Sequence, residues 1–65
     1  MMNNPIIDKL VEERKELRVK LNKLDIFLED SNLSEYHTNL LKEQRHVMNS
    51  YIDVLDRRIK DLIQK

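Results

Sequence analysis

The sequence contains no cysteine, no glycine and no tryptophan, and it has a single proline and a single phenylalanine. Without cysteine, disulfides and thiolate metal sites are both excluded. Without glycine, the chain has no glycine-rich phosphate loop. Glycine and proline are the residues that most often interrupt helices, so their scarcity predicts a chain built from long helices.

Side chains suited to catalysis or metal binding are also few. The two histidines, His37 and His46, fall on different helix faces and are too sparse for a metal cage. No Ser/His/Asp or Cys/His arrangement is evident, and the carboxylates mostly alternate with lysines and arginines, which keeps them ionised. We therefore expect a binding protein that is not an enzyme and that needs no cofactor and no metal ion.

An excess of charge of either sign is missing too, because twelve basic residues balance twelve acidic ones. Proteins that bind DNA are normally basic, so this balance argues against DNA as a partner. No segment approaches the roughly 18 apolar residues of a membrane span, and the N-terminus has no signal-peptide pattern. A cytosolic, soluble protein without a membrane partner is the expectation.

What is present is a chain of 65 residues with apolar residues at heptad spacing. The length allows one domain, 1–65, with helices predicted from about 5 to 30 and from about 34 to 63. Chains of this size rarely bury enough apolar surface alone. Since disulfides and metals are excluded, oligomerisation is the expected source of additional stability.

The first helix is expected to begin at Pro5, with Asn4 as its N-cap. Its apolar residues alternate at spacings of three and four, and Arg14 occupies the one polar position in this seam. The apolar members of the seam are Ile7, Leu10, Leu17, Leu21, Leu24 and Leu28. The pattern predicts one uninterrupted helix as far as Asp30.

The segment 30–34, DSNLS, is the only credible break. Ser34 can cap a second helix, and Asn32 is the residue expected to accept a left-handed conformation where glycine is absent. Because the connection is short, the two helices must lie antiparallel as neighbours. The predicted unit is an αα-hairpin.

The second helix carries the most informative pattern, because polar residues interrupt its apolar seam. The predicted seam is Leu41, Gln44, Met48, Tyr51, Leu55, Arg58 and Leu62. Flanking it are further apolar residues: Leu40, Val47, Ile52, Val54 and Ile59. The apolar arc is wider than one partner helix can cover, and the first helix shows a similar excess. The predicted fold is therefore all-α, a long antiparallel two-helix hairpin that assembles into a compact helical homo-oligomer.

Hairpin geometry places Arg14 opposite Tyr51 and Ile7 opposite Arg58. One interpretation is that Arg14 and Tyr51 form a cation–π pair that only fixes register. The other is that they line an anionic ligand site between chains, because a guanidinium offers a planar donor fork to phosphate and a tyrosine offers a face to a base. The sequence alone leaves both open.

Arg45, His46 and Asn49 form a second polar group on one side of the second helix. Such a group is usually a solvated face, and the alternative is a donor cluster at an oligomer axis where several chains converge on one polyanion. The first helix has a basic edge that ordinary surface ion pairs explain. That edge is formed by Lys9, Arg18, Lys20 and Lys23.

The two helices together carry a recognisable pattern. Residues 13–28 read like ExxxLxxKLxKLxxFL, and residues 40–59 read like LLxxQxxxMxxYxxxLxxRI. Over about 7–59, this arrangement resembles the helical hairpin domain of phage anti-CBASS and anti-Thoeris proteins, the cyclic-oligonucleotide sponges. The resemblance implies a compact homo-oligomer, typically a hexamer, that binds cyclic di- or trinucleotides in pockets between protomers.

The resemblance also implies a place and a mode of action. Such proteins sequester the signal in the host cytoplasm without cleaving it, so bacterial immune effectors stay off. Arg45 is the implied counterpart of an arginine that contacts trinucleotide phosphates, with His46 and Asn49 as its neighbours. Lys9 or Arg14 is the implied counterpart of a basic residue that meets a cyclic dinucleotide. Some members carry additional segments for ligand contact, whereas this chain is little more than the hairpin.

Two other hypotheses remain beside the ligand sponge. The chain can be a structural or interaction protein, a small coiled-coil bundle that docks a partner helix. The polar seam residues would then serve register and the choice of partner. A DNA-binding regulator is disfavoured by the neutral charge and by the lack of a third helix.

Overall fold

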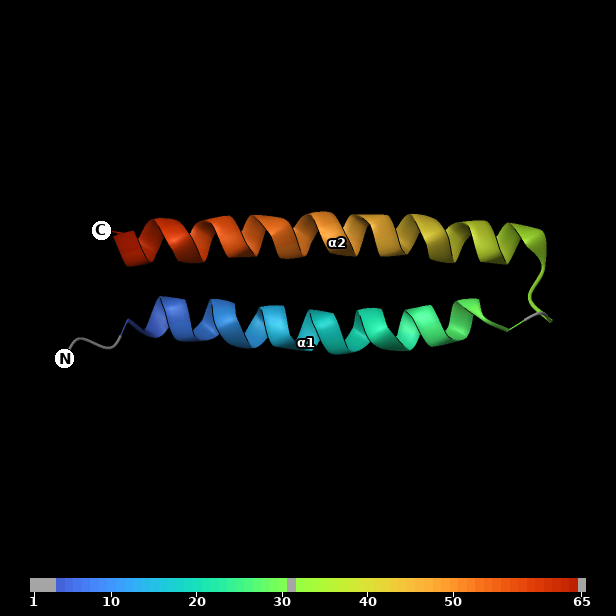
Figure 1. The fold of residues 1–65 in the computed structure, drawn as a ribbon, viewed down its shortest axis with the longest axis horizontal. Coiled ribbons are helices and arrows are strands. Elements are labelled where there is room, and N and C mark those ends of the chain that lie inside the picture. Colours follow the sequence, from blue (N-terminus) through green and yellow to red (C-terminus); the bar gives the residue numbers. More distant parts are fainter. Residues whose placement is uncertain (1–3, 31, 65) are drawn as a thin grey trace.

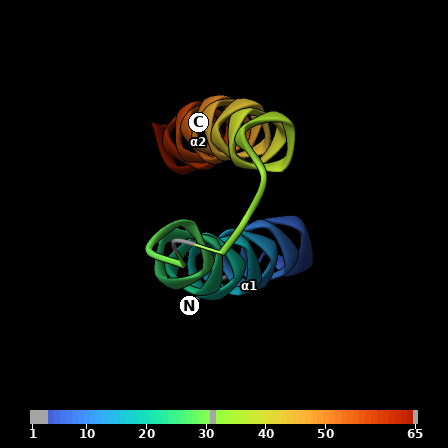
Figure 2. The ribbon, with the colours of Figure 1, turned by 90° about the vertical axis from the view of Figure 1, so that its right-hand side faces the viewer.

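The computed structural model describes residues 4–30 and 32–64, which form two helices, α1 (Pro5–Leu28) and α2 (Glu35–Gln64). The helices run antiparallel, so the start of α1 and the end of α2 lie at the same end of a rod of 52 × 15 × 11 Å (Figure 1). Viewed from the end that carries the turn, α2 lies above α1, and the turn connects the two helices on the near side (Figure 2). The predicted all-α hairpin is confirmed, and its assembly stays a prediction.

Both ends of α1 are set by local hydrogen bonds. Asn4 Oδ1 accepts from the Ile6 N–H at 2.9 Å, and Pro5 occupies the first turn, as predicted. The helix ends at Leu28, earlier than predicted. The Glu29 N–H donates to the Ile26 carbonyl three residues back at 3.1 Å, and the Asp30 N–H donates to the Phe27 carbonyl at 3.1 Å. These bonds tighten the last turn and satisfy carbonyls that the helix would otherwise leave open.

The described residues of the turn include none in the left-handed conformation. The Asn32 N–H donates to Asp30 Oδ1 at 2.9 Å, which is an Asx-turn, and no described residue has a positive φ. The expectation of a left-handed Asn32 is therefore wrong, because the Asp30 side chain supplies the turn that glycine would otherwise provide. Ser31, which belongs to the predicted break, lies outside the described residues.

Ser34 caps α2, as predicted. Its Oγ accepts from the His37 N–H at 3.1 Å, and its carbonyl accepts from Thr38 Oγ1 at 2.9 Å. The hydroxyl satisfies one of the free N–H groups of the first turn, and Glu35 places a negative charge beside them. The sequence thus fixes the start of α2 locally.

The seam of α1 lies where the pattern predicted, with Leu10 and Leu24 buried and the remaining members half-buried. The seam of α2 is shifted by one position at three places. Ile52 and Ile59 are buried there, and the third shifted position is half-buried Arg45. The residues predicted for these places are all exposed, and they are Gln44, Tyr51 and Arg58.

The shift in α2 has a simple physical reason. Both possible seams share four apolar residues, Leu41, Met48, Leu55 and Leu62, so heptad spacing permits either. Burying an isoleucine stabilises the hairpin by about 1.5–3 kcal/mol, whereas burying an arginine removes its charge from water. The hairpin therefore buries Ile52 and Ile59 and leaves Tyr51 and Arg58 outside. The same frame brings Arg45 into the seam in place of Gln44, where it stays only half-buried.

The core of the hairpin is small. Leu55 is the only fully buried side chain among the described residues, and it packs with Leu10 and Ile59 against Ile7, Leu17 and Leu62. Many apolar side chains remain exposed outside this core. Neither helix, over the residues described, combines the length and the apolar character that crossing a membrane requires.

Candidate functional site

The heptad register gives the hairpin two lateral sides, one on each flank of the seam. We call one the arginine side, and it contains Arg14, Arg18, Asp25, Arg45, Asn49 and Asp56. We call the other the tyrosine side, and it contains Glu13, Lys20, Phe27, Gln44 and Tyr51. Matching flanks meet across an antiparallel pair: Arg18 lies beside Asp56, and Tyr51 lies beside Glu13.

Arg14 and Asp56 form the central contact of the arginine side. Arg14 Nη1 donates to Asp56 Oδ1, and Arg18 Nη2 lies 3.8 Å from Asp56 Oδ2. The hydrogen bond from Arg14, helped by the charges of Arg14, Arg18 and Lys60, lowers the pKa of Asp56 although partial burial opposes this. The predicted pairing of Arg14 with Tyr51 is wrong, because the shifted seam brings Asp56 to Arg14 instead.

Arg45 is the other seam arginine, and it too has a carboxylate partner. Its Nη1 lies 3.4 Å from Asp25 Oδ1 on α1, and its side chain is 43% exposed. His46 and Asn49 are exposed on the same part of α2. The structure thus brings Arg14, Arg45 and Asn49 to the arginine side, where a phosphate would compete with aspartates for both guanidiniums.

Tyr51 lies on the opposite side of the hairpin. Its hydroxyl donates to Glu13 Oε2 at 2.6 Å, while the residue as a whole stays 44% exposed. The bond to Glu13 raises the pKa of Tyr51, because the phenolate would lose this bond and be repelled by the carboxylate. Lys9 is exposed and lies toward the same side of α1 by register. No single surface of one hairpin therefore contains all six predicted ligand residues.

Between the helices, near the turn, the tyrosine side has a hollow of ≈ 280 Å³. Leu24 and Leu41 form its apolar floor, and no carboxylate lines it. Its polar and aromatic lining consists of Lys20, Lys23, Phe27, His37 and Gln44. Sequence reasoning treated the lysines as ordinary surface. The available signal was the seven-residue spacing from Lys20 to Phe27 and from His37 to Gln44, which places one pair on each helix on the same flank.

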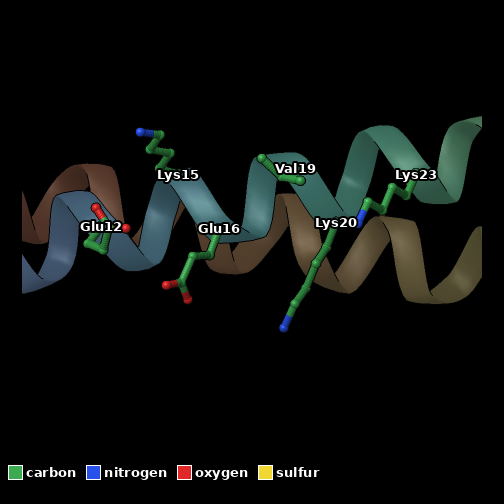
Figure 3. A pocket seen from close by; sticks show the side chains of 6 residues that line it. All are labelled: Glu12, Lys15, Glu16, Val19, Lys20 and Lys23. Carbon is green, nitrogen blue, oxygen red and sulfur yellow. The ribbon is translucent and has the colours of Figure 1, made fainter.

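A second hollow of ≈ 280 Å³ lies on the outer face of α1. All six labelled side chains come from this one helix, with α2 behind it (Figure 3). They are Glu12, Lys15, Glu16, Val19, Lys20 and Lys23. With acids interleaved among the lysines and no wall from a second element, this surface is a solvated charged face. Among the residues described, no three His, Asp or Glu side chains come together to hold a metal ion.

Comparison with known proteins places the chain in a family. The sequence model of the family described as Sequestin matches residues 4–61. The matched range includes all of α1, the turn and α2 except its last residues, and so it contains both sides of the hairpin and the hollow. No curated protein and no solved structure matches the chain.

Proposed function

We propose, because the chain belongs to the Sequestin family, that it binds and sequesters cyclic oligonucleotide second messengers, cyclic di- or trinucleotides, without cleaving them. Membership of this family indicates sequestration of signalling molecules by binding instead of catalysis. The match over 4–61 is the observation that carries the proposal. In a phage-infected cell, removing the messenger from the host cytoplasm keeps bacterial immune effectors inactive.

The chemistry of the ligand fits the side chains on offer. A cyclic oligonucleotide has two or three phosphates and flat bases, so it needs charge-assisted donors and stacking surfaces in a concave site. The proposed contacts are Lys9, Arg14, Arg45, His46, Asn49 and Tyr51. Because these residues lie on two sides of the hairpin, a ligand that meets them all must bind between protomers.

Exposed apolar residues support the assembly that such pockets require. Leu40, Val47 and Val54 follow each other at seven-residue intervals along α2, and they are 44%, 59% and 41% exposed. We call these three residues the valine stripe. Apolar side chains that are exposed in a row along one face of a helix are a surface that a second copy covers in symmetric homo-oligomers. We propose a homo-oligomer, a hexamer by the family resemblance.

Thermal melting tests the proposal. The chain is melted alone and with each member of a panel of cyclic di- and trinucleotides. Binding to the native state should raise the melting midpoint as the ligand concentration rises. At a ligand concentration of 100 times the dissociation constant, the free energy of unfolding should increase by about 2.7 kcal/mol. The ligand recovered by chromatography should be unchanged. No shift at concentrations far above micromolar would exclude those ligands, and recovery of a cleaved ligand would contradict sequestration.

Arg45→Ala tests the proposed contacts within the same experiment. The variant should weaken trinucleotide binding while the assembly stays intact. Arg57→Ala is the matched control, because Arg57 is well exposed and, among the residues that the structure describes, pairs with Asp53 of its own helix alone. Equal loss in both variants would show an effect of net charge alone.

The second candidate function is a structural or interaction protein that docks a partner helix. The valine stripe favours it, since an exposed apolar stripe on a helix is also the surface on which an amphipathic partner helix packs. The melting panel separates the two functions. A protein that only docks a helix should show no shift with any cyclic nucleotide.

A further inference from the structure

We propose that the hollow on the tyrosine side is a further anion-binding subsite that holds one phosphate and one base of a nucleotide. Lys20 and Lys23 meet the phosphate, and Phe27 stacks on the base. The nucleotide chemistry rests on the proposed function, but the position does not. None of the six contacts proposed above lines this hollow.

Charge favours a phosphate at this position. The three arginines of the arginine side already have carboxylate partners: Arg14 and Arg18 share Asp56, and Arg45 has Asp25. Over the described part of the chain, Lys20 and Lys23 form no ion pair, and no acid lines the hollow between them and α2. A phosphate therefore binds here without displacing a carboxylate, and it gains charge-assisted hydrogen bonds from two ammonium groups.

The hollow also offers a surface on which a base can stack. Phe27 is 56% exposed, although it is the only phenylalanine of the chain. An open aromatic ring beside cationic groups is the arrangement by which proteins stack nucleobases. Gln44 on the opposite helix has an amide that can both donate to and accept from a base edge. Buried Leu24 closes the floor and excludes water from below.

The size of the hollow suits a small ligand. Its volume of ≈ 280 Å³ lies just under the range of about 300–1,000 Å³ that is typical of pockets for drug-sized ligands, and it is open to solvent on one side. We assign it one nucleotide unit of a larger ligand. Leu40, the first residue of the valine stripe, directly precedes Leu41 of the floor. A second copy packed on the stripe would supply the missing wall and the contacts to the next nucleotide.

The test uses AMP as a probe, titrated calorimetrically and by amide NMR into the full chain. AMP should shift the amides of Phe27, His37 and Gln44 first. The double substitution Lys20→Gln and Lys23→Gln should weaken AMP binding at least tenfold. The matched control is the double substitution Lys15→Gln and Lys60→Gln, which removes the same charge outside the hollow and should change the affinity for AMP less than twofold. Glutamine keeps the helix propensity of lysine, so both double variants should melt like the wild type.

Phe27→Leu separates stacking from charge, because it should weaken AMP while leaving the affinity for inorganic phosphate unchanged. Equal loss of AMP affinity in the two double variants, or amide shifts centred on Arg45, would overturn the subsite. The cyclic-nucleotide panel keeps the two proposals apart. If the K20Q/K23Q variant binds cyclic nucleotides as the wild type does, the subsite fails and the proposed function stands. If AMP binds in the hollow but no cyclic nucleotide binds, the subsite stands and the proposed function fails.

Discussion

The two sides of the hairpin come from the same two helices, yet they differ in how their side chains are partnered. The charged groups of one side are paired across the seam, whereas the other side exposes mostly apolar groups. On the arginine side, Arg14, Arg18 and Arg45 are bonded or close to Asp25 and Asp56 across the seam. Among the described residues, the tyrosine side has one cross-helix bond, Tyr51 to Glu13. By register this side also includes Ile6 and the valine stripe, and so it holds most of the large apolar residues that are exposed: Ile6, Phe27, Leu40, Val47, Tyr51 and Val54.

This difference between the sides indicates that one aligns the two helices and that the other contacts a partner. Polar groups that are satisfied within the chain fix how the helices align, and they need no further partner. Apolar and cationic groups left without partners favour contact with a second chain or a ligand. The arginine side therefore aligns the two helices of one hairpin, and a ligand that contacts Arg14 or Arg45 there must compete with Asp56 or Asp25. The tyrosine side has the surface that we expect to contact a second chain.

Val47→Asp should have the largest effect, because it places a charge at the centre of the valine stripe. Val47 is 59% exposed in the single hairpin, so the substitution should leave the helices folded. In an assembled interface the buried carboxylate costs about 3 kcal/mol, which raises the dissociation constant of the assembly by about 100-fold. Light scattering at fixed protein concentration measures the loss of the oligomer.

Val11→Asp is the matched control on the other side. Val11 is 38% exposed and lies on the arginine flank of α1 by register. The same change of residue there should leave the assembly at its normal mass. Dissociation by Val11→Asp, or a normal mass with Val47→Asp, would reverse the assignment of the two sides.

Asp56→Asn should have an intermediate effect, on stability and on its pH dependence. Because the folded-state pKa of Asp56 is lowered, its contribution is present above the ordinary value of 3.8 and is lost as the pH falls through the folded pKa. The variant should melt below the wild type at pH 7, since Arg14 loses its charged partner. The gap should narrow as the pH falls below 3.8.

Asp53→Asn is the comparison for that experiment, because Asp53 pairs with Arg57 on the exposed face of the same helix at 3.1 Å. Exposed pairs of this kind contribute little, so its melting curve should follow the wild type at every pH. If Asp53→Asn reproduces the loss seen with Asp56→Asn, the arginine side has no special part in aligning the helices.

The contrast between the sides also explains how far the sequence could be read. The caps at Asn4 and Ser34 were predictable because each depends on one side chain and its own helix turn. The α1 seam was predictable because only one heptad frame fits its apolar residues. In α2 two frames fit, and the choice depends on whether Ile52 or Tyr51 faces the partner helix, which is a question of packing and not of spacing.

That one choice accounts for the errors at the candidate site. With the seam displaced, Arg14 meets Asp56 in place of Tyr51, and Arg45 moves from a solvated face into the seam. The hollow was beyond sequence reasoning because it depends on which flanks of α1 and α2 meet, and that follows only once the frame of α2 is known. The ligand residues named from the sequence stay predictions.

Tyr51→Phe should have the smallest effect, because the hydroxyl that it removes lies on an exposed side chain. The raised folded-state pKa of Tyr51 means that its contribution is present below the ordinary value of 10.0 and is lost as the pH rises through the folded pKa. At pH 7 the variant should melt no more than about 4 °C below the wild type. Above pH 10 the two melting curves should converge.

The hydroxyl bond itself is tested by two companions of Tyr51→Phe. Tyr36→Phe removes a hydroxyl from a residue that is 73% exposed, and it should leave the melting midpoint unchanged at all pH values. Glu13→Gln should lower the pKa of Tyr51 toward 10.0 in a phenolate absorbance titration, because the repelling carboxylate is gone. If Glu13→Gln leaves the pKa of Tyr51 unchanged, the bond between Tyr51 and Glu13 does not form in solution. On the tyrosine side, α2 would then be held to α1 by the apolar seam, without this hydrogen bond.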